Sequence, residues 1–496
     1  MNSFAFPAML AVASPFRPCL SAPVVPPRGV HPVFRRAAGK GAAPSPPKQS
    51  SMAELLRFAL PALGISLSGP ILSNIDNAFV GHLTGAEGLA ALSPGTVVAD
   101  YLLYLLVFLP RATVGLVSRA FATGGAKAAQ PELQRALSVA MPVGIALSVV
   151  YLTCTDRILR ALHVAPNLIP YAASYARVRG AVTWAALCQT VCLSALLATK
   201  DAWTPLKVVA VAAIANCCGD FALCVWPFRL GVGGAAAATS IATLLSFGLM
   251  VRALRAKEML PEQWLRLPSS VEYLAPLMEY AGPLLIVVAT RMVSLSAMAL
   301  SAAALGTTAL AGYQILINFF SLFSLVGEPL SQAAQAMLPP LLEKKDMLGA
   351  RRATKSLLVL GLGAGAVAGT AAFVCAAFGG GAFSGDSAVI DVVHRSASTL
   401  LLAVAALVFA YPVDGAMLAT KNFRVLIALS IFGLMAQLPA LQLITRSFGG
   451  SRQPALPLSL LMMTLLGRLV VLILFSLAKL WPDLSTKPAG AGEEGQ

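Results

Sequence analysis

Residues 58–83 read FALPALGISLSGPILSNIDNAFVGHL, and this stretch decides how the rest of the chain is interpreted. It is apolar and exceeds the roughly 20 residues that a helix needs to cross a bilayer. Asp76 lies inside it, and a carboxylate at membrane depth costs about 2.5 kcal/mol or more unless it faces a protein interior or a water-filled cavity. Pro61 and Pro70 interrupt backbone hydrogen bonds in the same stretch. The sequence therefore predicts a kinked transmembrane helix that lines a cavity.

The composition of the whole chain is that of a polytopic membrane protein. Of its 496 residues, 57% are hydrophobic and 11% are charged, whereas a soluble domain carries about 25% charged residues. No nucleic-acid-reading motif occurs, so the net charge of +15 is better explained by orientation signals and contact with anionic lipid. The 8 cysteines form no C-x-x-C, and we interpret them as small apolar residues rather than as metal ligands or disulfides.

The first 50 residues have the composition of an organellar transit peptide. They contain no acid, since the first is Glu54, and they are rich in Ala, Pro, Ser and basic residues. A plastid is the first destination we expect and a mitochondrion the second. A disordered tail without a targeting role is the alternative for residues 1–50.

From Ala53 onward the chain contains about twelve apolar spans, so we expect an all-α fold of two six-helix lobes. The expected order is an N-lobe (53–254), a polar linker (255–275), a C-lobe (276–480) and a disordered tail (481–496). The links after even-numbered spans carry more Lys and Arg, which places both termini on the cytosol-like side, the stroma of a plastid. The expected spans are 54–82, 96–119, 136–154, 178–198, 205–227, 231–253, 276–304, 309–338, 355–378, 397–420, 423–445 and 455–480.

The two halves repeat short motifs in the same order. Gly69-Pro70 recurs as Gly282-Pro283, and the sequence L-A-T-K occurs at residues 197–200 and again at 418–421. Because each half contains an even number of spans, both halves have the same orientation in the membrane. The pattern predicts a parallel repeat about an axis along the membrane normal, a plan suited to alternating access.

Nucleotide chemistry is excluded by two observations. The glycine-rich run GLGAG at residues 361–365 follows no strand and has the wrong spacing for a nucleotide loop, so it predicts close helix packing. No G-x-x-x-x-G-K-[ST] occurs, so the chain has no ATPase of its own. We expect no cofactor. We also expect that transport is driven by an ion gradient or by the solute's own gradient.

Few acids lie inside the spans, so each is a candidate site residue. Asn216 and Asp220 lie four residues apart in the fifth span and share one helical face. With Asp76 they would give a hard-oxygen cluster able to hold Na⁺ or to share a proton; no other metal site is expected. The alternative for each acid is a helix cap or a residue at the membrane surface, and that alternative suits Asp100 best.

The second half and the arginines supply further candidates. Glu328 lies in the eighth span and Asp414 in the tenth, while Arg111 and Arg291 also fall within apolar spans. One interpretation of the arginines is a cationic patch for an organic anion; the other is charge balance for nearby acids, or snorkelling. Gln314 is kept with them as a substrate or second-lobe candidate. His82 is expected to be interfacial.

At these residues the sequence resembles the multidrug and toxic compound extrusion (MATE) family. Residues 74–83, NIDNAFVGHL, are similar to the family's D-T-A-F-V-G segment, and Pro61 stands where the family has a bending proline. N-x-x-x-D at 216–220 matches the fifth helix of the family. GAAAAT at 234–239 resembles the opening of the sixth helix, and the resemblance implies that Thr239 lines the cation pocket.

The second half carries the resemblance further. VDGAMLATKNFR at 413–424 resembles the tenth-helix segment with Asp414 as its acid, and GEPLSQ at 327–332 is similar to the plant plastid-envelope branch, the DETOXIFICATION-like members related to salicylic acid export. There is one departure from the family pattern. The seventh span offers Arg291 but no acid at mid-membrane, because Glu279 lies close to its start. This departure favours a cation site in the first lobe.

The resemblance implies secondary active transport in a plastid envelope membrane. We expect export of a small organic solute, an organic anion if the arginines bind it, by antiport with H⁺ or Na⁺, with the cation held by Asp76, Asn216, Asp220 and Thr239. A lipid or lipid-linked flippase is the alternative. A membrane enzyme such as a prenyltransferase would need paired acids such as D-D-x-x-D, which do not occur. The expected partners are the solute and the bilayer, without nucleic acid or an ATPase subunit.

Overall fold

The computed structural model describes residues 52–162, 164–225, 228, 230–260, 264, 271–379, 386–449 and 455–484. The chain divides into residues 1–48 and a compact unit of residues 49–496, and all described residues belong to the second unit. The predicted transit peptide (1–50) therefore lies outside the described residues, as does the tail beyond residue 484. The described residues are helical and contain no strand, as predicted.

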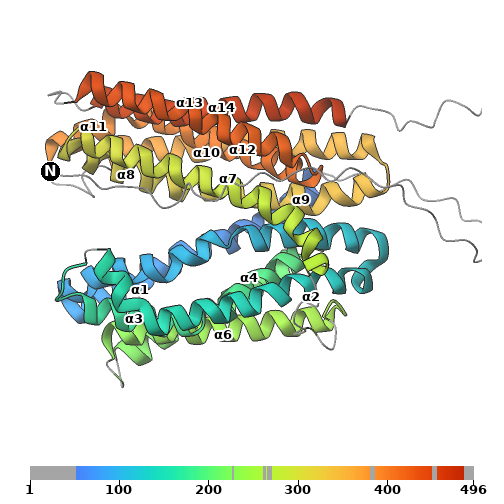
Figure 1. The fold of residues 1–496 in the computed structure, drawn as a ribbon, viewed down its shortest axis with the longest axis horizontal. Helices are drawn as coiled ribbons and strands as arrows, with labels where there is room; N and C mark the ends of the chain where they lie inside the picture. Colours follow the sequence, from blue (N-terminus) through green and yellow to red (C-terminus); the bar gives the residue numbers. More distant parts are fainter. Residues whose placement is uncertain are drawn as a thin grey trace, which may run out of the picture. The chain divides into compact units, whose positions relative to one another are not determined.

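The described residues of the first half form six α-helices and one π-helix. Figure 1 shows its helices bundled together in blue and green. The elements are α1 (Met52–Leu105), α2 (Phe108–Ala161), α3 (Ile169–Ala181), α4 (Thr183–Ala198), α5 (Trp203–Asp220), the π-helix η1 (Phe221–Val225) and α6 (Gly231–Ala256).

In the part of the second half that the structure describes, there are eight α-helices and one 3₁₀-helix. They form a second bundle, drawn from yellow to red in Figure 1. The elements are α7 (Val271–Ala304), α8 (Thr307–Ser324), the 3₁₀-helix η2 (Leu325–Gly327), α9 (Glu328–Glu343), α10 (Met347–Phe378), α11 (Ser387–Arg395), α12 (Ala397–Ala419), α13 (Phe423–Phe448) and α14 (Ala455–Asp483).

Each predicted span falls on helix, but several boundaries differ from the prediction. Ten described helices are long and apolar enough to span a membrane, or eleven if α3 and α4, bent by 51°, form one span. The predicted second span (96–119) begins in α1 and crosses residues 106–107 into α2. The predicted third span lies in the same α2, after Gly124 and Gly125, which have non-helical backbone angles. The fourth starts earlier than predicted, at Ile169, and α14 continues to Asp483. Likewise α6 ends at residue 256 and α7 begins at residue 271, which shortens the predicted linker at both ends.

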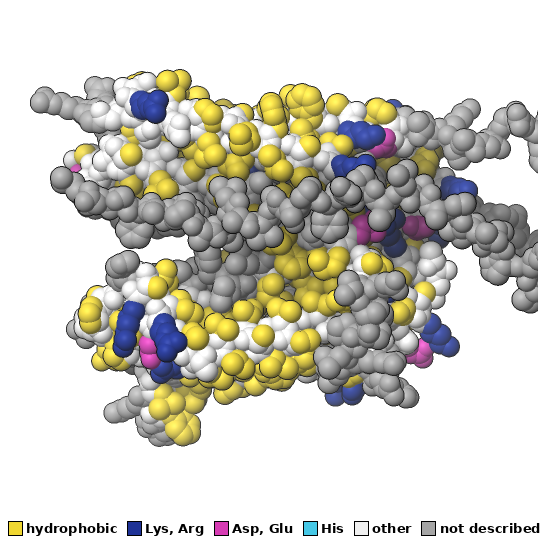
Figure 2. All heavy atoms as spheres, viewed as in Figure 1, with side chains coloured by type: hydrophobic (Ala, Val, Ile, Leu, Met, Phe, Trp, Pro, Cys, Tyr) yellow, Lys and Arg dark blue, Asp and Glu magenta, His cyan; other side chains and the backbone are white. Residues whose placement is uncertain are grey.

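The surface of the second unit fits a bilayer environment. In the view of Figure 2, hydrophobic side chains cover the middle of the helices, and Lys, Arg, Asp and Glu side chains gather toward the helix ends. Large apolar side chains such as Leu300, Val367 and Phe378 are more than 70% exposed. This exposure would be costly in water but is favourable in lipid.

The repeated L-A-T-K motif has the same local structure in both halves. Lys200 ends the turn after α4 with φ of 65°, and Lys421 ends the turn after α12 with φ of 59°. The backbone N–H of Lys200 donates to the Leu197 carbonyl at 2.9 Å, and that of Lys421 donates to the Leu418 carbonyl at 3.1 Å. A left-handed lysine is uncommon, so its recurrence at equivalent positions supports the predicted internal repeat.

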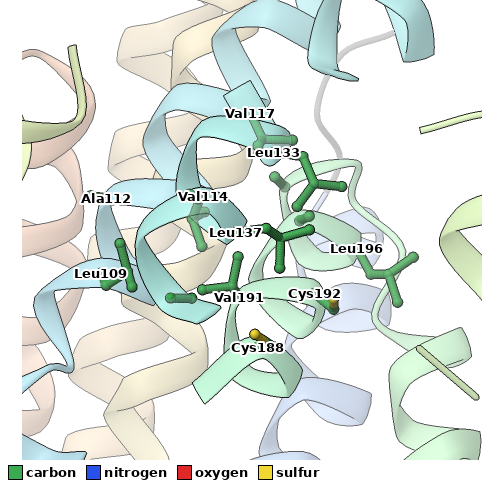
Figure 3. Packing of buried hydrophobic residues seen from close by; sticks show 14 of the residues in the cluster. Leu109, Ala112, Val114, Val117, Leu133, Leu137, Cys188, Val191, Cys192 and Leu196 are labelled. Atoms are coloured by element: carbon green, nitrogen blue, oxygen red, sulfur yellow. The ribbon is translucent and has the colours of Figure 1, made fainter. Parts of the chain in front are cut away.

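The core of the first half is built where α2 folds back against α4. Figure 3 shows Leu109 and Val117, from the start of α2, facing Leu133 and Leu137, which follow the Gly124–Gly125 break. Val191, Cys188 and Cys192 of α4 complete this layer. Cys188 and Cys192 are fully buried among apolar side chains, in agreement with their interpretation as small apolar residues, whereas Cys218 is exposed.

One face of α2 makes the polar contacts between the two halves. Arg111, Gly115, Ser118 and Arg119 lie along this face because they follow helical spacing. The Ser118 hydroxyl donates to the Gln335 carbonyl of α9 at 2.9 Å. A Cβ on Gly115 would lie 2.9 Å from the Tyr280 ring of α7, so glycine permits the close approach.

Arg119 extends this contact to the ends of α9 and α12. Its guanidinium lies 3.1 Å from the Glu343 carboxylate and also donates to the Ala419 carbonyl. Leu55 and Phe58 of α1 join Met337 and Met417 in an apolar cluster that spans both halves. The halves therefore meet at the end of the helices where the basic links lie, next to Lys200, Lys344, Lys345 and Lys421.

The glycine-rich run in α10 packs on α12, which confirms the predicted close helix packing. A Cβ on Gly361 would lie 2.8 Å from Pro412, and a Cβ on Gly365 would lie 2.8 Å from the Ala405 carbonyl oxygen. Gly369 continues the same face, with Leu401 as its neighbour. Gly363 faces away and would meet nothing within 4 Å.

We expect the substitution Gly365→Ala to lower the stability of the protein by about 1–3 kcal/mol, because the backbones of α10 and α12 must move apart. The matched control Gly363→Ala should be neutral, or stabilising by up to about 1 kcal/mol through helix propensity. Thermal unfolding of the two purified variants in the same detergent measures the difference. Equal unfolding midpoints for the two variants would contradict the packing described here.

Candidate functional site

Asp76, Asn216 and Asp220 meet in the first half, as the sequence predicted, and Thr239, which the family resemblance implied, joins them. The Asn216 amide donates to Asp76 Oδ1 at 2.8 Å and to Asp220 Oδ2 at 3.0 Å. The Thr239 hydroxyl lies 3.2 Å from Asp76 Oδ2 and 3.0 Å from the Ala235 carbonyl, so its single proton is shared between them. These four residues are called the acidic cluster below.

The acidic cluster is closed to solvent and holds unused oxygen atoms. Asp76 is 5% exposed, Asn216 is 1% and Asp220 is 0%. Asn216 Oδ1 and Asp220 Oδ1 are buried without a hydrogen-bond partner, whereas buried polar atoms normally have one. The two carboxyl groups lie close together, because both accept a hydrogen bond from the same Asn216 amide nitrogen. Two carboxylates this close do not both stay ionised in a low-dielectric interior unless a cation lies between them.

Local backbone features bring α5 and α6 to this point. α5 ends at Asp220 and continues as the π-helix η1, and such segments are frequent at functional sites. A Cβ on Gly219 would lie 2.9 Å from Ala238 Cβ, and one on Gly234 would lie 2.8 Å from the Leu223 carbonyl oxygen. The two glycines therefore allow α5 and η1 to approach α6 closely.

The prolines of the first span lie in α1 on the N-terminal side of Asp76. The backbone is helical through Pro61 and Pro70, and Pro61 is buried. Asp76 is the last residue of the candidate span Met52–Asp76. A change in the course of α1 at either proline would move Asp76 relative to Asn216 on α5.

Arg111 and Glu328 form an ion pair across the two halves. Arg111 Nη2 lies 3.0 Å from Glu328 Oε2 and 3.2 Å from Oε1. Glu328 is the first residue of α9, directly after the 3₁₀-helix η2. Among the polar contacts that α2 makes with the second half, this pair lies farther from the basic links than Ser118–Gln335 and Arg119–Glu343. The sequence had left Arg111 open between an anion site and charge balance, and here it balances Glu328.

A cavity of about 380 Å³ lies in the second half and contains Asp414 and Arg291. The Arg291 guanidinium carbon lies 5.8 Å from the centre of the Tyr411 ring. Arg468 of α14 also lines this cavity and was missed by the sequence analysis. The signal was available, because Arg468 interrupts α14, the most apolar candidate span among the described residues.

The remaining candidates lie elsewhere. Gln314 of α8 is exposed and is not among the residues that line the cavity. Glu279 pairs with Lys421 at 3.1 Å near the basic links, so it is not a mid-membrane acid. The side chains of Asp100 and His82 lie outside the described residues. Among the described residues, no group of three or more His, Cys, Asp or Glu side chains gathers as a metal site.

Comparison with known proteins gives the family. The pattern that defines MatE matches residues 61–221 and again residues 283–441. The chain belongs to the MatE family. The two matches fall one in each half, in agreement with the internal repeat.

Named relatives and solved structures agree with this assignment. Protein DETOXIFICATION 47, chloroplastic, of Arabidopsis thaliana is 30% identical over 406 residues, which cover 80% of this chain and 73% of the relative. Protein DETOXIFICATION 44, chloroplastic, of the same plant is 27% identical over 68% of this chain and 66% of its own length. The Vibrio cholerae MATE transporter VcmN in the bent form shares the fold with a TM-score of 0.77, at 19% identity over 87% of this chain and 97% of VcmN. This MatE chain is therefore a multi-pass membrane protein of a transporter family.

In the acidic cluster we expect Asn216→Ala to destabilise this MatE protein by about 1–3 kcal/mol, because the buried Asp76 and Asp220 lose their shared donor. Adding Asp220→Asn should recover part of the loss, since the new amide can donate to Asp76. Thermal unfolding of the single and double variants gives the coupling, with the exposed Asn318→Ala on α8 as the matched control. Additive losses in the double variant would show that the cluster is not one hydrogen-bonded unit.

Proposed function

We propose that this protein exports a small organic solute by antiport with H⁺ or Na⁺. The observation that carries the proposal is the acidic cluster. Two buried carboxyl groups on candidate membrane spans are held by one amide, and two oxygen atoms of the cluster have no hydrogen-bond partner. A buried carboxylate pair is costly without a cation, and intramembrane ionisable residues mark ion or substrate paths.

Both coupling ions suit the chemistry of the cluster. A proton can be shared between Asp76 and Asp220, and the same carboxylate, amide and hydroxyl oxygens are hard ligands for Na⁺. Either cation would neutralise charge between α1 and α5. We propose that this favours a different course of α1 near Pro61 and Pro70, so that the cation prefers one conformation of the first half.

Alternating access requires that the polar contacts between α2 and the second half, called the α2 contact, break and re-form. The described conformation is joined through Arg111–Glu328, Ser118–Gln335 and Arg119–Glu343 at the end that carries the basic links. By the positive-inside rule that end faces the cytosol-like side, so this conformation is closed toward it. The cation and the solute can drive transport only through their differential affinities for the closed and open conformations.

The proposed location is the plastid envelope, with a mitochondrial membrane as the alternative. The acid-free, basic composition of residues 1–50 supports an organelle. Two relatives bear the word chloroplastic in their names, which favours the plastid. An organic anion is the solute class favoured by Arg291 and Arg468, which lie within apolar helices and line one cavity.

The decisive experiment is uptake into proteoliposomes with a pH gradient or a Na⁺ gradient imposed separately. Benzenesulfonate and tetraethylammonium serve as probe anion and probe cation, because both stay charged and leak slowly. We expect one gradient to drive uptake of one probe, and Asp76→Asn to reduce that uptake to the level of protein-free liposomes, because the acidic cluster loses a cation ligand.

The control variant for this experiment is Asp391→Asn, which alters an exposed acid paired with Arg395 within α11. It should keep full uptake. Full gradient-driven uptake by Asp76→Asn would contradict the assignment of the cation site. No response of either probe to either gradient would contradict the antiport and would direct attention to lipid flipping.

A further inference from the structure

One face of α10 is exposed along its length, and its chemistry changes from one end to the other. The exposed side chains recur every three or four residues, so they form a single stripe along the helix. In the first three turns the stripe carries Arg351, Arg352 and Lys355. Beyond them the exposed residues of the stripe are uncharged and mostly apolar: Val359, Leu362, Gly363, Ala366, Val367, Thr370, Val374 and Phe378.

The basic end of this stripe keeps an excess of positive charge. Residues 343–355 carry five Lys or Arg and two acids. Among the described residues, no acidic side chain forms an ion pair with the three arginine and lysine side chains of the stripe. The acids at this end of α9, α10 and α14 already hold other partners: Glu343 with Arg119, Asp346 with the Gly349 backbone N–H, and Asp483 with Lys479.

Trp481 of α14 indicates the depth of the basic end in the membrane. The Arg351 guanidinium carbon lies 4.6 Å from the centre of the Trp481 ring. Tryptophan concentrates where the hydrocarbon core meets the lipid head groups, and Trp481 lies in the last turn of a candidate span. The ring covers one face of the planar guanidinium, whose N–H groups point outward along its edge and can donate to an anion. The basic end therefore lies at head-group level.

The apolar part of the stripe is hollowed next to α8. A groove of about 620 Å³ is lined by Phe323 of α8 and by residues of α10 between Ala366 and Cys375. Because a helix rises about 1.5 Å per residue, Ala366 lies about 20 Å along α10 from Arg352. This distance is about half of the roughly 40–45 Å that a bilayer with its head groups spans. A lipid chain anchored at the basic end would thus reach the start of the groove.

We propose that this face of α10 is a binding site for a lipid with an anionic head group. Arg351, Arg352 and Lys355 hold a phosphate or sulfonate head group, and an acyl chain follows Val359 and Leu362 toward the groove. A lipid suits the face better than a free anion does, because the basic residues are continuous with an apolar surface. The inference does not depend on the solute or on the coupling ion.

The proposed lipid site lies on the opposite side of α10 from the contact between the two halves. Ala350, Ala353 and Leu357, on the buried face of the same turns, belong to the apolar cluster that includes Leu55 and Phe58 of α1. A lipid that holds the exposed face of these turns would keep α10 in place against that cluster. Bound anionic lipid should therefore stabilise the described conformation, in which the halves meet at this end.

The test is thermal unfolding of the purified full-length protein in dodecylmaltoside micelles, titrated with dioleoyl phosphatidylglycerol or dioleoyl phosphatidylcholine. We expect phosphatidylglycerol to raise the unfolding midpoint saturably, and the zwitterionic lipid to have little effect at the same concentration. The triple variant Arg351→Gln/Arg352→Gln/Lys355→Gln should need about tenfold more phosphatidylglycerol, or higher, for half-saturation, because each basic residue attracts the anionic lipid. Arg351→Lys/Arg352→Lys should keep most of the response, since it keeps the charge.

The matched control removes three exposed basic residues from α5 and α6, in the variant Lys207→Gln/Arg252→Gln/Arg255→Gln. It changes the net charge by the same amount, so it should respond to phosphatidylglycerol as the parent protein does. Each variant is compared with its own lipid-free midpoint, which separates a loss of stability from a loss of binding. If the first triple variant does not fold, Arg352→Gln/Lys355→Gln gives the same test and keeps Arg351 on the Trp481 ring.

Three results would overturn the proposed site: equal shifts with the two lipids, unchanged half-saturation in the folded α10 variant, or an equal loss in the matched control. Glycerol 3-phosphate, a soluble anion of the same chemistry, should leave the midpoint unchanged. A shift as large as that caused by phosphatidylglycerol would indicate a site for free anions and would overturn the lipid assignment. These outcomes are independent of gradient-driven uptake, so the proposed antiport is tested separately.

Discussion

The cost of placing charge at membrane depth is the constraint on which the rest of this structure depends. A charged side chain in an apolar helix has to find a partner, a hydrogen-bond donor or water. The described structure gathers these side chains into separate groups. Asp76 and Asp220 share the Asn216 amide, and Arg111 and Glu328 join the two halves. Arg291 and Arg468 line the same cavity as Asp414 in the second half.

The first two groups differ in how movement would affect them. The acidic cluster lies within one half, so it can stay together while the halves move. The Arg111–Glu328 pair joins α2 to α9, so it must separate whenever the α2 contact opens. Both partners are about one-fifth exposed, so water can solvate them after separation and limit the energetic cost. A partly exposed pair is therefore better suited to a moving contact than a fully buried one.

The sequence predicted those features that depend on local spacing or on composition. Helical periodicity placed Asn216 and Asp220 on one face, and the resemblance to a family added Thr239 to the pocket. The repeated L-A-T-K predicted two equivalent helix ends, which the structure confirms at Lys200 and Lys421. The glycine-rich run predicted close packing, although spacing alone did not tell that Gly363 faces away from α12.

The features that the sequence did not predict depend on contacts between distant segments. Arg111 and Glu328 are 217 residues apart, and nothing in the local pattern of either indicates the other. Some helix ends also differ from the predicted boundaries, because α3 and α4 are joined through a bend and α14 extends to Asp483. Arg468 was overlooked although its position in an apolar span carries the same signal as Arg111.

The two halves repeat one backbone plan but carry opposite charge chemistry. The acidic cluster of the first half has two carboxyl groups and no arginine, whereas the cavity of the second half has two arginines and one acid. A site with excess negative charge gains from a cation, and a site with excess positive charge gains from an anion. The internal repeat would by itself suggest two equivalent sites. The different charges of the two sites instead indicate that each binds a different kind of ion. Under the proposed function, the acidic cluster of the first half takes the driving cation, and the contacts that α2 makes with the second half couple cation binding to the movement between the halves.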